Sequence, residues 1–166
     1  YVSLTHGEGY GLPLFEAAYH GLPIIAPDWS GHLDFLYMPV KDKKSKKEKM
    51  KAMFTKVDYK LAPIPKEAVW DGVLQADSMW CYSDEGSYKM KLREMKAKYS
   101  HKKQQAEKLK SWILENFEQS KMYKQMAESI AGGELKLIEN PDYIFVSDIF
   151  AEQYEGGAEL SLQALI

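Results

Sequence analysis

Cysteine, long apolar runs and an excess of one charge are all scarce in this chain, and each absence excludes a class of protein. The 166 residues include one cysteine, Cys81, so neither a disulfide framework nor a cysteine-based zinc site can form within one chain. No apolar stretch approaches the roughly 18 residues that a membrane span requires, and no signal peptide is visible. The formal net charge of −2 gives no overall attraction to nucleic acid or anionic lipid. We therefore expect a soluble, cytoplasmic protein without a transmembrane segment.

The composition and the two ends of the sequence indicate a folded piece of a longer protein. Hydrophobic residues make up 45% of the chain, which is enough to bury a core. The sequence begins with "YVSLT", which reads as a buried strand, and ends with "SLQALI", a helical pattern without a stop signal. Both ends therefore appear, at the level of sequence, to be cut.

The first thirty residues predict a βαβ unit, and hence an α/β fold. Residues 1–4 read as a strand, residues 6–11 as a glycine-rich loop, and residues 12–20 as a short helix with Pro13 in its first turn. Gly21 is a typical helix stop, and "LPIIAP" suits a buried parallel strand. In such a unit the loop lies at the carboxyl end of the first strand and leads into the amino end of the helix.

That position of the loop has a chemical consequence. Free N–H groups and the positive end of the helix dipole favour an anion there, and glycines allow the backbone to approach it closely. A carboxylate in the loop would repel a phosphate, so Glu8 needs another role, and accepting hydrogen bonds from hydroxyl groups beside the phosphate is a natural one. Glu16, about one helical turn further on, could accept from a second pair of hydroxyls. Two diol acceptors beside one phosphate loop describe a nucleotide-sugar site.

The motif resembles a known family. "EGYGLPLFEA", with its two glutamates in an E-x7-E pattern and the following "GLPIIAPDWSG", resembles the donor-site motif of family-4 retaining glycosyltransferases, which have the GT-B fold. The resemblance implies that Glu8 contacts the hydroxyls of the donor sugar in the catalytic site and that Glu16 holds the ribose. It further implies that loop amides contact the sugar and diphosphate, namely those of Gly9, Tyr10, Gly11 and Leu12. The alternative is a βαβ turn with an incidental pair of glutamates.

The resemblance also implies an architecture and a reaction. The fold would be a partial GT-B C-terminal lobe, with a Rossmann-like parallel sheet and a helical closing segment. The reaction would transfer a hexose from a nucleotide-sugar to a hydroxyl of a glycan or other acceptor, with retention and without a cofactor or metal. The basic diphosphate clamp and the first lobe of the family have no counterpart in this sequence, so we expect the chain alone to bind donor weakly and not to turn over.

"DWSGHLDFL" departs from the family pattern, which has a glycine pair and a glutamate at this place. Asp28, His32 and Asp34 therefore receive no role from the resemblance. Their spacing fits no strong metal-binding pattern. We expect surface or capping positions for all three.

The segment "KDKKSKKEKMK" at residues 41–51 offers a second hypothesis, a non-catalytic module that binds a polyanion. It is rich in lysine, at positions Lys41, Lys43, Lys44, Lys46, Lys47, Lys49 and Lys51. An anionic membrane surface is one partner for such a segment. No aromatic residue interleaves with the lysines, so we expect no nucleic-acid partner. The alternative interpretation is a solvated loop or the start of a helix.

The remaining sequence predicts an irregular segment, a run of helices and a change of composition. Residues 57–81 read as irregular, with "KEAVWDGV" as a candidate helix. Residues 87–130 read as helical, with one apolar face formed by Leu109, Trp112, Ile113 and Phe117. This part also resembles the closing helices of GT-B enzymes.

Residues 132–166 are acidic after a glycine pair and contain the strand-like "YIFVSDIF". They resemble the start of a second glycosyltransferase-like unit, which would divide the chain into residues 1–131 and 132–166. The alternative is a strand and helix that complete the first lobe.

Overall fold

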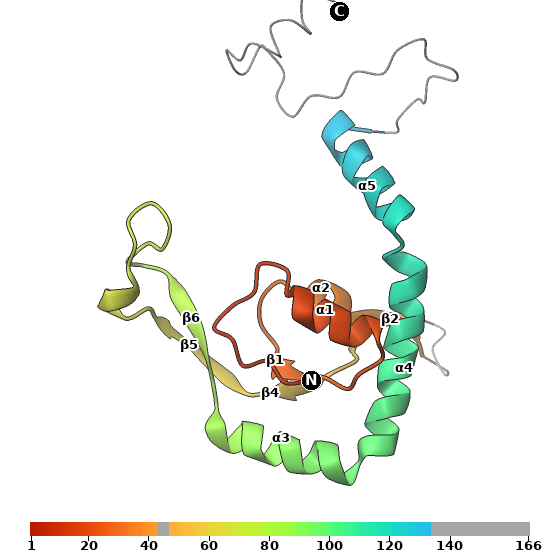
Figure 1. The fold of residues 1–166 in the computed structure, drawn as a ribbon, viewed down its shortest axis with the longest axis horizontal. Helices are drawn as coiled ribbons and strands as arrows, with labels where there is room; N and C mark the ends of the chain where they lie inside the picture. Colours follow the sequence, from red (N-terminus) through yellow and green to blue (C-terminus); the bar gives the residue numbers. More distant parts are fainter. Residues whose placement is uncertain (43–46, 134–166) are drawn as a thin grey trace, which may run out of the picture. The chain divides into compact units, whose positions relative to one another are not determined.

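The computed structural model describes residues 1–42 and 47–133 (Figure 1). The chain divides into two units, Tyr1–Tyr123 and Lys124–Ile166. Of the second unit, the structure describes residues 124–133, namely the end of the last helix and the two glycines after it. The helices are α1 (Leu12–Tyr19), α2 (Leu33–Leu36), α3 (Glu85–Ala97), α4 (Tyr99–Asn116), α5 (Gln119–Ala131) and the 3₁₀ turn η1 (Lys66–Ala68). The strands are β1 (Ile25–Pro27), β2 (Tyr37–Lys41), β3 (Glu48–Ala52), β4 (Thr55–Val57), β5 (Tyr59–Pro63) and β6 (Met79–Ser83).

The first elements form a small parallel β-structure, in which α1 connects the Val2 bridge to β1 along the chain. Val2 forms a parallel bridge with Ile25, and two backbone hydrogen bonds of 2.9 and 3.0 Å join Ile25 to Tyr1 and Ser3. On its other side β1 pairs in parallel with β4. The predicted strand at residues 1–4 is thus reduced to one bridge, while the α/β class is confirmed. The finer expectation of a Rossmann-like sheet stays a prediction.

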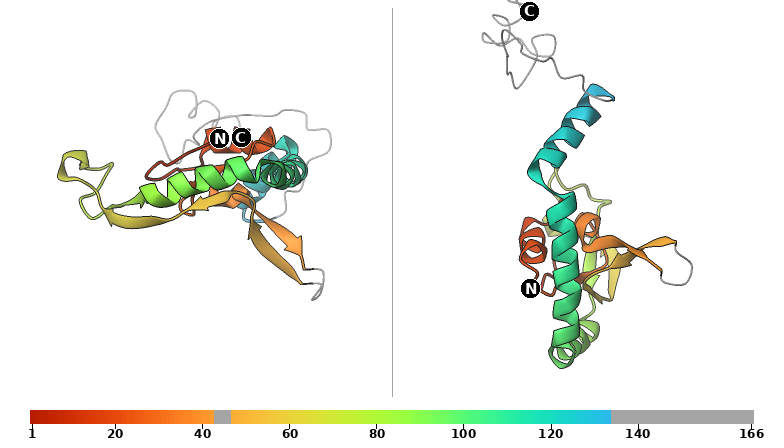
Figure 2. Two further views of the ribbon diagram at one scale, coloured as in Figure 1. Left: turned by 90° about the horizontal axis from the view of Figure 1, so that it is seen from below. Right: turned by 90° about the vertical axis from the view of Figure 1, so that its right-hand side faces the viewer.

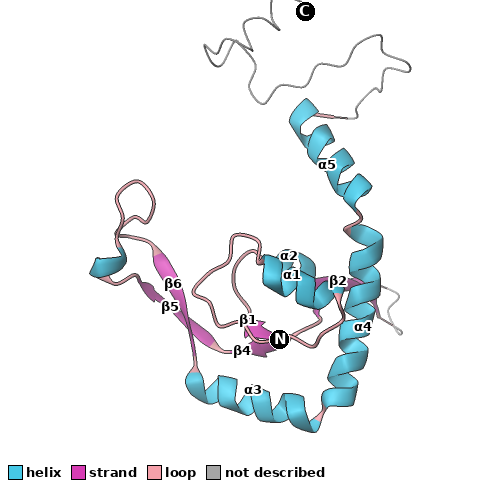
Figure 3. Cartoon of the chain, in the orientation of Figure 1, coloured by secondary structure: helices cyan, strands magenta, loops and turns pink. Residues whose placement is uncertain are grey.

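Helix α1 begins and ends close to where the sequence signals place it (Figure 3). Gly11 precedes it with φ 87°, a left-handed conformation that glycine adopts without the steric cost of a Cβ. The amide of Phe15 donates to the carbonyl of Gly11 at 2.9 Å, which is the first turn of the helix. At the other end, Gly21 has φ 67° and its amide donates to Ala18. The prediction that the glycine loop meets a helix amino terminus is confirmed.

Two antiparallel ribbons were not predicted. Strands β2 and β3 pair with each other, and their ribbon stands out to one side in the right-hand view of Figure 2, so Lys41 and residues 48–51 of the lysine-rich segment lie in strands. Strands β5 and β6 pair across the segment predicted to be irregular, and "KEAVWDGV" forms a single 3₁₀ turn at Lys66–Ala68 instead of a helix. Most side chains of β3 and β5 are exposed, so neither strand shows the alternation of apolar and polar residues that marks a half-buried strand.

The core lies between α1, α2, α4 and the parallel strands. Leu109 and Ile113 of α4 are 1% exposed, and Trp112 and Phe117 pack against the same cluster, which confirms the predicted apolar face of this helix. Phe15 of α1 packs against the end of α4, because its ring lies 5.7 Å from that of Phe117, the residue after α4. Removing such apolar surface from water is the main stabilising contribution to the fold.

The prediction of a second unit at residues 132–166, and of a strand within "YIFVSDIF", concerns residues 134–166, which lie outside the described part of the chain. It stays a prediction, as does its alternative.

Candidate functional site: two loops at the carboxyl end of the parallel strands

Two loops follow the parallel elements at the same edge. The first, residues 5–11, follows the Val2 bridge and leads into α1; the second, residues 28–32, follows β1 and leads into α2. Because parallel strands end at a common edge, both loops lie at the carboxyl end of this small sheet. In α/β proteins this is the edge at which ligands characteristically bind.

The second loop holds the backbone of Glu8 in place. The Ser30 hydroxyl accepts a hydrogen bond from the Glu8 amide at 2.6 Å and donates to the Glu8 carbonyl at 2.5 Å. The Gly31 amide donates to the same carbonyl at 3.0 Å. Gly31 also approaches Gly9 so closely that a Cβ on Gly31 would lie 2.0 Å from the Gly9 carbonyl oxygen. Three hydrogen bonds and one close backbone contact therefore fix the first loop on the second.

Glu8 is partly exposed, and its side chain is held from within its own loop. The Thr5 hydroxyl donates to Oε1 of Glu8 at 2.9 Å. A carboxylate accepts through two oxygens with about four lone-pair positions, so this single bond leaves capacity for further donors. The arrangement can therefore hold an acceptor carboxylate toward ligand hydroxyls.

The other residues predicted for the site surround the amino end of α1. Gly11 and Leu12 begin the helix, so their amides have no carbonyl one turn earlier to bond with, and Pro13 has no N–H. Tyr10 is 39% exposed, and its ring packs on Phe35 at 5.2 Å, which anchors the middle of the loop on the core. Burial, and then the charge of Asp34, raise the pKa of the Tyr10 phenol.

Glu16 lies one turn into α1 and is exposed. The structure thus gathers residues 8–12 into one loop at the helix terminus, with Glu16 beyond it on the same helix. A helix amino terminus combined with two accessible carboxylates can bind an anion and hydrogen-bond neighbouring hydroxyls.

His6 was not expected in this site, yet it links the first loop to the β5–β6 ribbon. Its Nδ1 lies 2.8 Å from the Cys81 carbonyl, and the Cys81 amide donates to the His6 carbonyl at 3.0 Å. The imidazole stacks on Trp80 with a centroid distance of 4.6 Å. Burial raises the pKa of the Cys81 thiol, which keeps it protonated at neutral pH. The contacts of His6 with Trp80 and Cys81 join residues 74 and 75 apart, and no local sequence signal predicts them.

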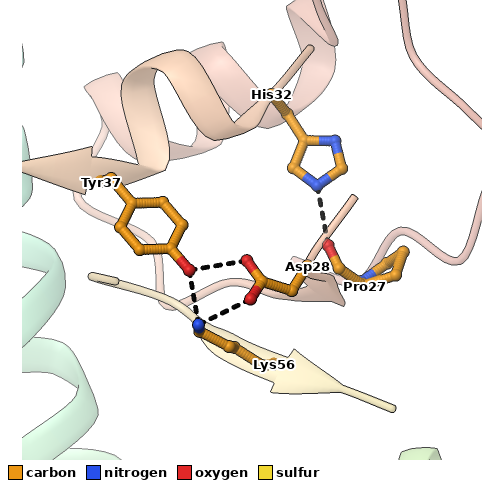
Figure 4. A network of polar contacts seen from close by, with 5 residues as sticks. All are labelled: Pro27, Asp28, His32, Tyr37 and Lys56. Carbon is orange, nitrogen blue, oxygen red and sulfur yellow. Dashed lines mark hydrogen bonds and ion pairs between the residues drawn. The ribbon is translucent and has the colours of Figure 1, made fainter. Parts of the chain in front are cut away.

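His32 corrects a prediction, because it is neither a surface residue nor a side-chain cap. It is 1% exposed, and its Nε2 lies 2.9 Å from the Pro27 carbonyl (Figure 4). A carbonyl can only accept, so Nε2 carries the proton. His32 is the N-cap residue that precedes α2, but its side chain makes no capping hydrogen bond, and Nδ1 has no partner among the described residues. Through this hydrogen bond the imidazole instead connects the start of α2 to the end of β1.

Asp28 belongs to a polar network at the same edge. Its carboxylate accepts from the Tyr37 hydroxyl at 2.7 Å and from the Lys56 ammonium at 2.7 Å, and Lys56 also donates to the Tyr37 oxygen at 2.5 Å (Figure 4). The hydrogen bond to Asp28 is the main cause that raises the pKa of Lys56. Asp34 is exposed in the first turn of α2, where a carboxylate complements the helix dipole.

Within residues 1–42 and 47–133, no three His, Cys, Asp or Glu side chains are grouped in a way that could hold a metal ion. Among the helices of the same ranges, none combines the length and the hydrophobicity that crossing a bilayer requires.

Comparisons of the chain with protein-family models, with characterised proteins and with solved structures find no match.

Proposed function

We propose that the loop at residues 5–12 binds a nucleotide-diphosphate sugar, and that this binding serves the retaining transfer of a hexose to an acceptor hydroxyl. In this proposal the amides of Gly9, Tyr10, Gly11 and Leu12 contact the diphosphate and sugar. Glu8 accepts hydrogen bonds from the sugar hydroxyls, which is a positioning contribution to catalysis. Glu16 accepts from the ribose. A Rossmann-like lobe and a cytoplasmic location are parts of the same proposal.

One observation carries the proposal. The glycine loop leaves the carboxyl end of a parallel β-element and enters the amino end of α1, and the Glu8 carboxylate in this loop accepts from the Thr5 hydroxyl. A carboxylate can accept about four hydrogen bonds, so the single described donor, the Thr5 hydroxyl, leaves positions open for further donors. Ligand hydroxyls would supply the others. The amides at the helix terminus would meet the phosphates that accompany such hydroxyls in a nucleotide-sugar.

Calorimetric titration of the 166-residue chain with a panel of nucleotide-diphosphate sugars tests the proposal. At least one member should bind, and Glu8→Gln and Glu16→Gln should each weaken it by about 1–3 kcal/mol, because each removes a charged acceptor. That loss corresponds to about five- to 150-fold in Kd. Glu67→Gln is the matched control, since Glu67 is exposed on η1 and belongs to neither loop. Binding that responds equally to all three variants would contradict the proposed site.

The second candidate function is polyanion binding by residues 41–51. One observation favours it: Lys41, Lys49 and Lys51 are exposed on the β2–β3 hairpin. Heparin binding that falls steeply between low and moderate salt, together with indifference to nucleotide-sugars, would support this function in place of donor binding. Peripheral contact with an anionic membrane would follow the same salt dependence.

A further inference from the structure

A cavity of about 660 Å³ lies between the β2–β3 hairpin and one face of α4. None of its lining residues belongs to the loops at residues 5–11 and 28–32. Its volume falls in the range of about 300–1,000 Å³ typical of pockets for small organic ligands. The cavity is thus a candidate site separate from the one proposed for the donor.

Part of the lining is apolar and held in place. Met38 and Met53 line the cavity from the hairpin side and Trp112 from α4, and Met53 is 6% exposed. The side-chain amide of Gln105, also in the lining, donates to the Ala52 carbonyl at 3.0 Å. This bond ties α4 to the end of β3, so the two walls of the cavity have a defined separation.

Positive charge enters the cavity from both walls. Lys51 lies on β3 and Lys108 on α4, and neither forms an ion pair with a residue that the structure describes. Lys41 and Glu48 also line the cavity but offset each other, since their charged atoms are 3.9 Å apart. Glu115 is two turns along α4 from Lys108, about 10 Å along the helix axis. With Lys41 and Glu48 offset, the ammonium groups of Lys51 and Lys108 exceed the one remaining carboxylate, that of Glu115, so the lining carries a net positive charge.

We infer that this cavity binds a small organic anion, with an apolar body against Met38, Met53 and Trp112 and a carboxylate or phosphate between Lys51 and Lys108. An uncharged ligand would leave the two ammonium groups without a counterion, and a cation would be repelled by them. An inorganic anion alone would leave the apolar lining in contact with water. An amphipathic anion satisfies both parts of the cavity.

Two probes that differ in charge test the inference on the 166-residue chain. Naphthalene-2-carboxylate and naphthalene-2-carboxamide have the same ring system, and their binding is followed by nuclear magnetic resonance at the indole N–H signals. The carboxylate should bind at least about tenfold more tightly than the carboxamide, and the signal of Trp112 should shift most among the tryptophans. Equal affinities, no binding of the carboxylate at millimolar concentration, or an unmoved Trp112 signal would overturn the inference.

Three lysine variants then locate the anion. Lys51→Gln and Lys108→Gln should each weaken the carboxylate about three- to tenfold and leave the carboxamide unchanged. Lys49→Gln is the control, because Lys49 is exposed on the same strand but does not line this cavity. The same loss in all three variants would refute the clamp between the walls. Should a variant fail to fold, as judged by circular dichroism, the comparison of the two probes on the unaltered chain still decides whether the cavity prefers an anion.

Discussion

Replacing Gly31 with alanine should separate the two loops of the site and destabilise the chain. The added Cβ would lie 2.0 Å from the Gly9 carbonyl oxygen, whereas real Cβ contacts shorter than 3.0 Å are essentially never found. The loops must therefore move apart by about 1 Å, because the contacting atom is backbone and cannot rotate away. Such a shift breaks the three hydrogen bonds that Ser30 and Gly31 make to Glu8.

The size of the effect follows from those three bonds. At a net contribution of about 1 kcal/mol each, their loss lowers the free energy of unfolding by about 3 kcal/mol. The smaller conformational entropy of unfolded alanine offsets about 0.4–1 kcal/mol of this loss. We therefore expect Gly31→Ala to lower the free energy of unfolding by about 2–3 kcal/mol.

Urea denaturation followed by far-UV circular dichroism measures this effect, and Gly9→Ala provides the control. A Cβ on Gly9 would meet nothing within 4 Å, so this variant should stay within about 1 kcal/mol of the unaltered chain. If the two alanine variants unfold at the same urea concentration, the close packing of the loops is refuted.

Three other predictions concern single side chains. Ser30 has φ 86°, a left-handed conformation that costs a residue with a Cβ more than it costs glycine. Ser30→Gly and Ser30→Ala both lose the hydrogen bonds to Glu8, but only the glycine variant relieves the backbone strain. Thermal unfolding should therefore find the alanine variant less stable, and the reverse order would show that Ser30 is not strained. Because the pKa of Lys56 is raised, its contribution to the free energy of unfolding is fully present below the ordinary lysine pKa of about 10.4 and is lost as pH rises through the higher folded value. Denaturation between pH 9 and 11 should show a smaller alkaline loss of stability in Asp28→Asn than in the unaltered chain, and an equal loss would argue against the pair. Ile113→Ala should lower the free energy of unfolding, measured by urea denaturation, by about 2–5 kcal/mol, because Ile113 is 1% exposed. Leu114→Ala, at a position 43% exposed, should lower it far less. Similar values for the two variants would show that α4 is not packed as described.

Local sequence signals alone were sufficient to predict α1 and the helical run that follows residue 85. Pro13 near the start, Gly11 and Gly21 at the ends and the apolar side chains between them all favour one short helix, and each signal acts within a few residues. The period of Leu109 and Ile113 likewise identified the buried face of α4, because helical periodicity is a property of neighbouring turns. The position of Glu8 in the loop before α1 followed from the same local signals.

Tertiary structure decided what surrounds that loop. Ser30 acts on Glu8 across 22 residues and His6 on Cys81 across 75, and neither pair is marked by spacing or composition. His32 looked like a surface residue because histidine is polar, yet the carbonyl of Pro27 gives its imidazole a buried partner. The two antiparallel ribbons escaped prediction because one strand of each, β3 and β5, is mostly exposed, so backbone pairing rather than an apolar stripe defines them. Periodicity reports burial and bonding within one segment, whereas these features depend on which distant segments meet.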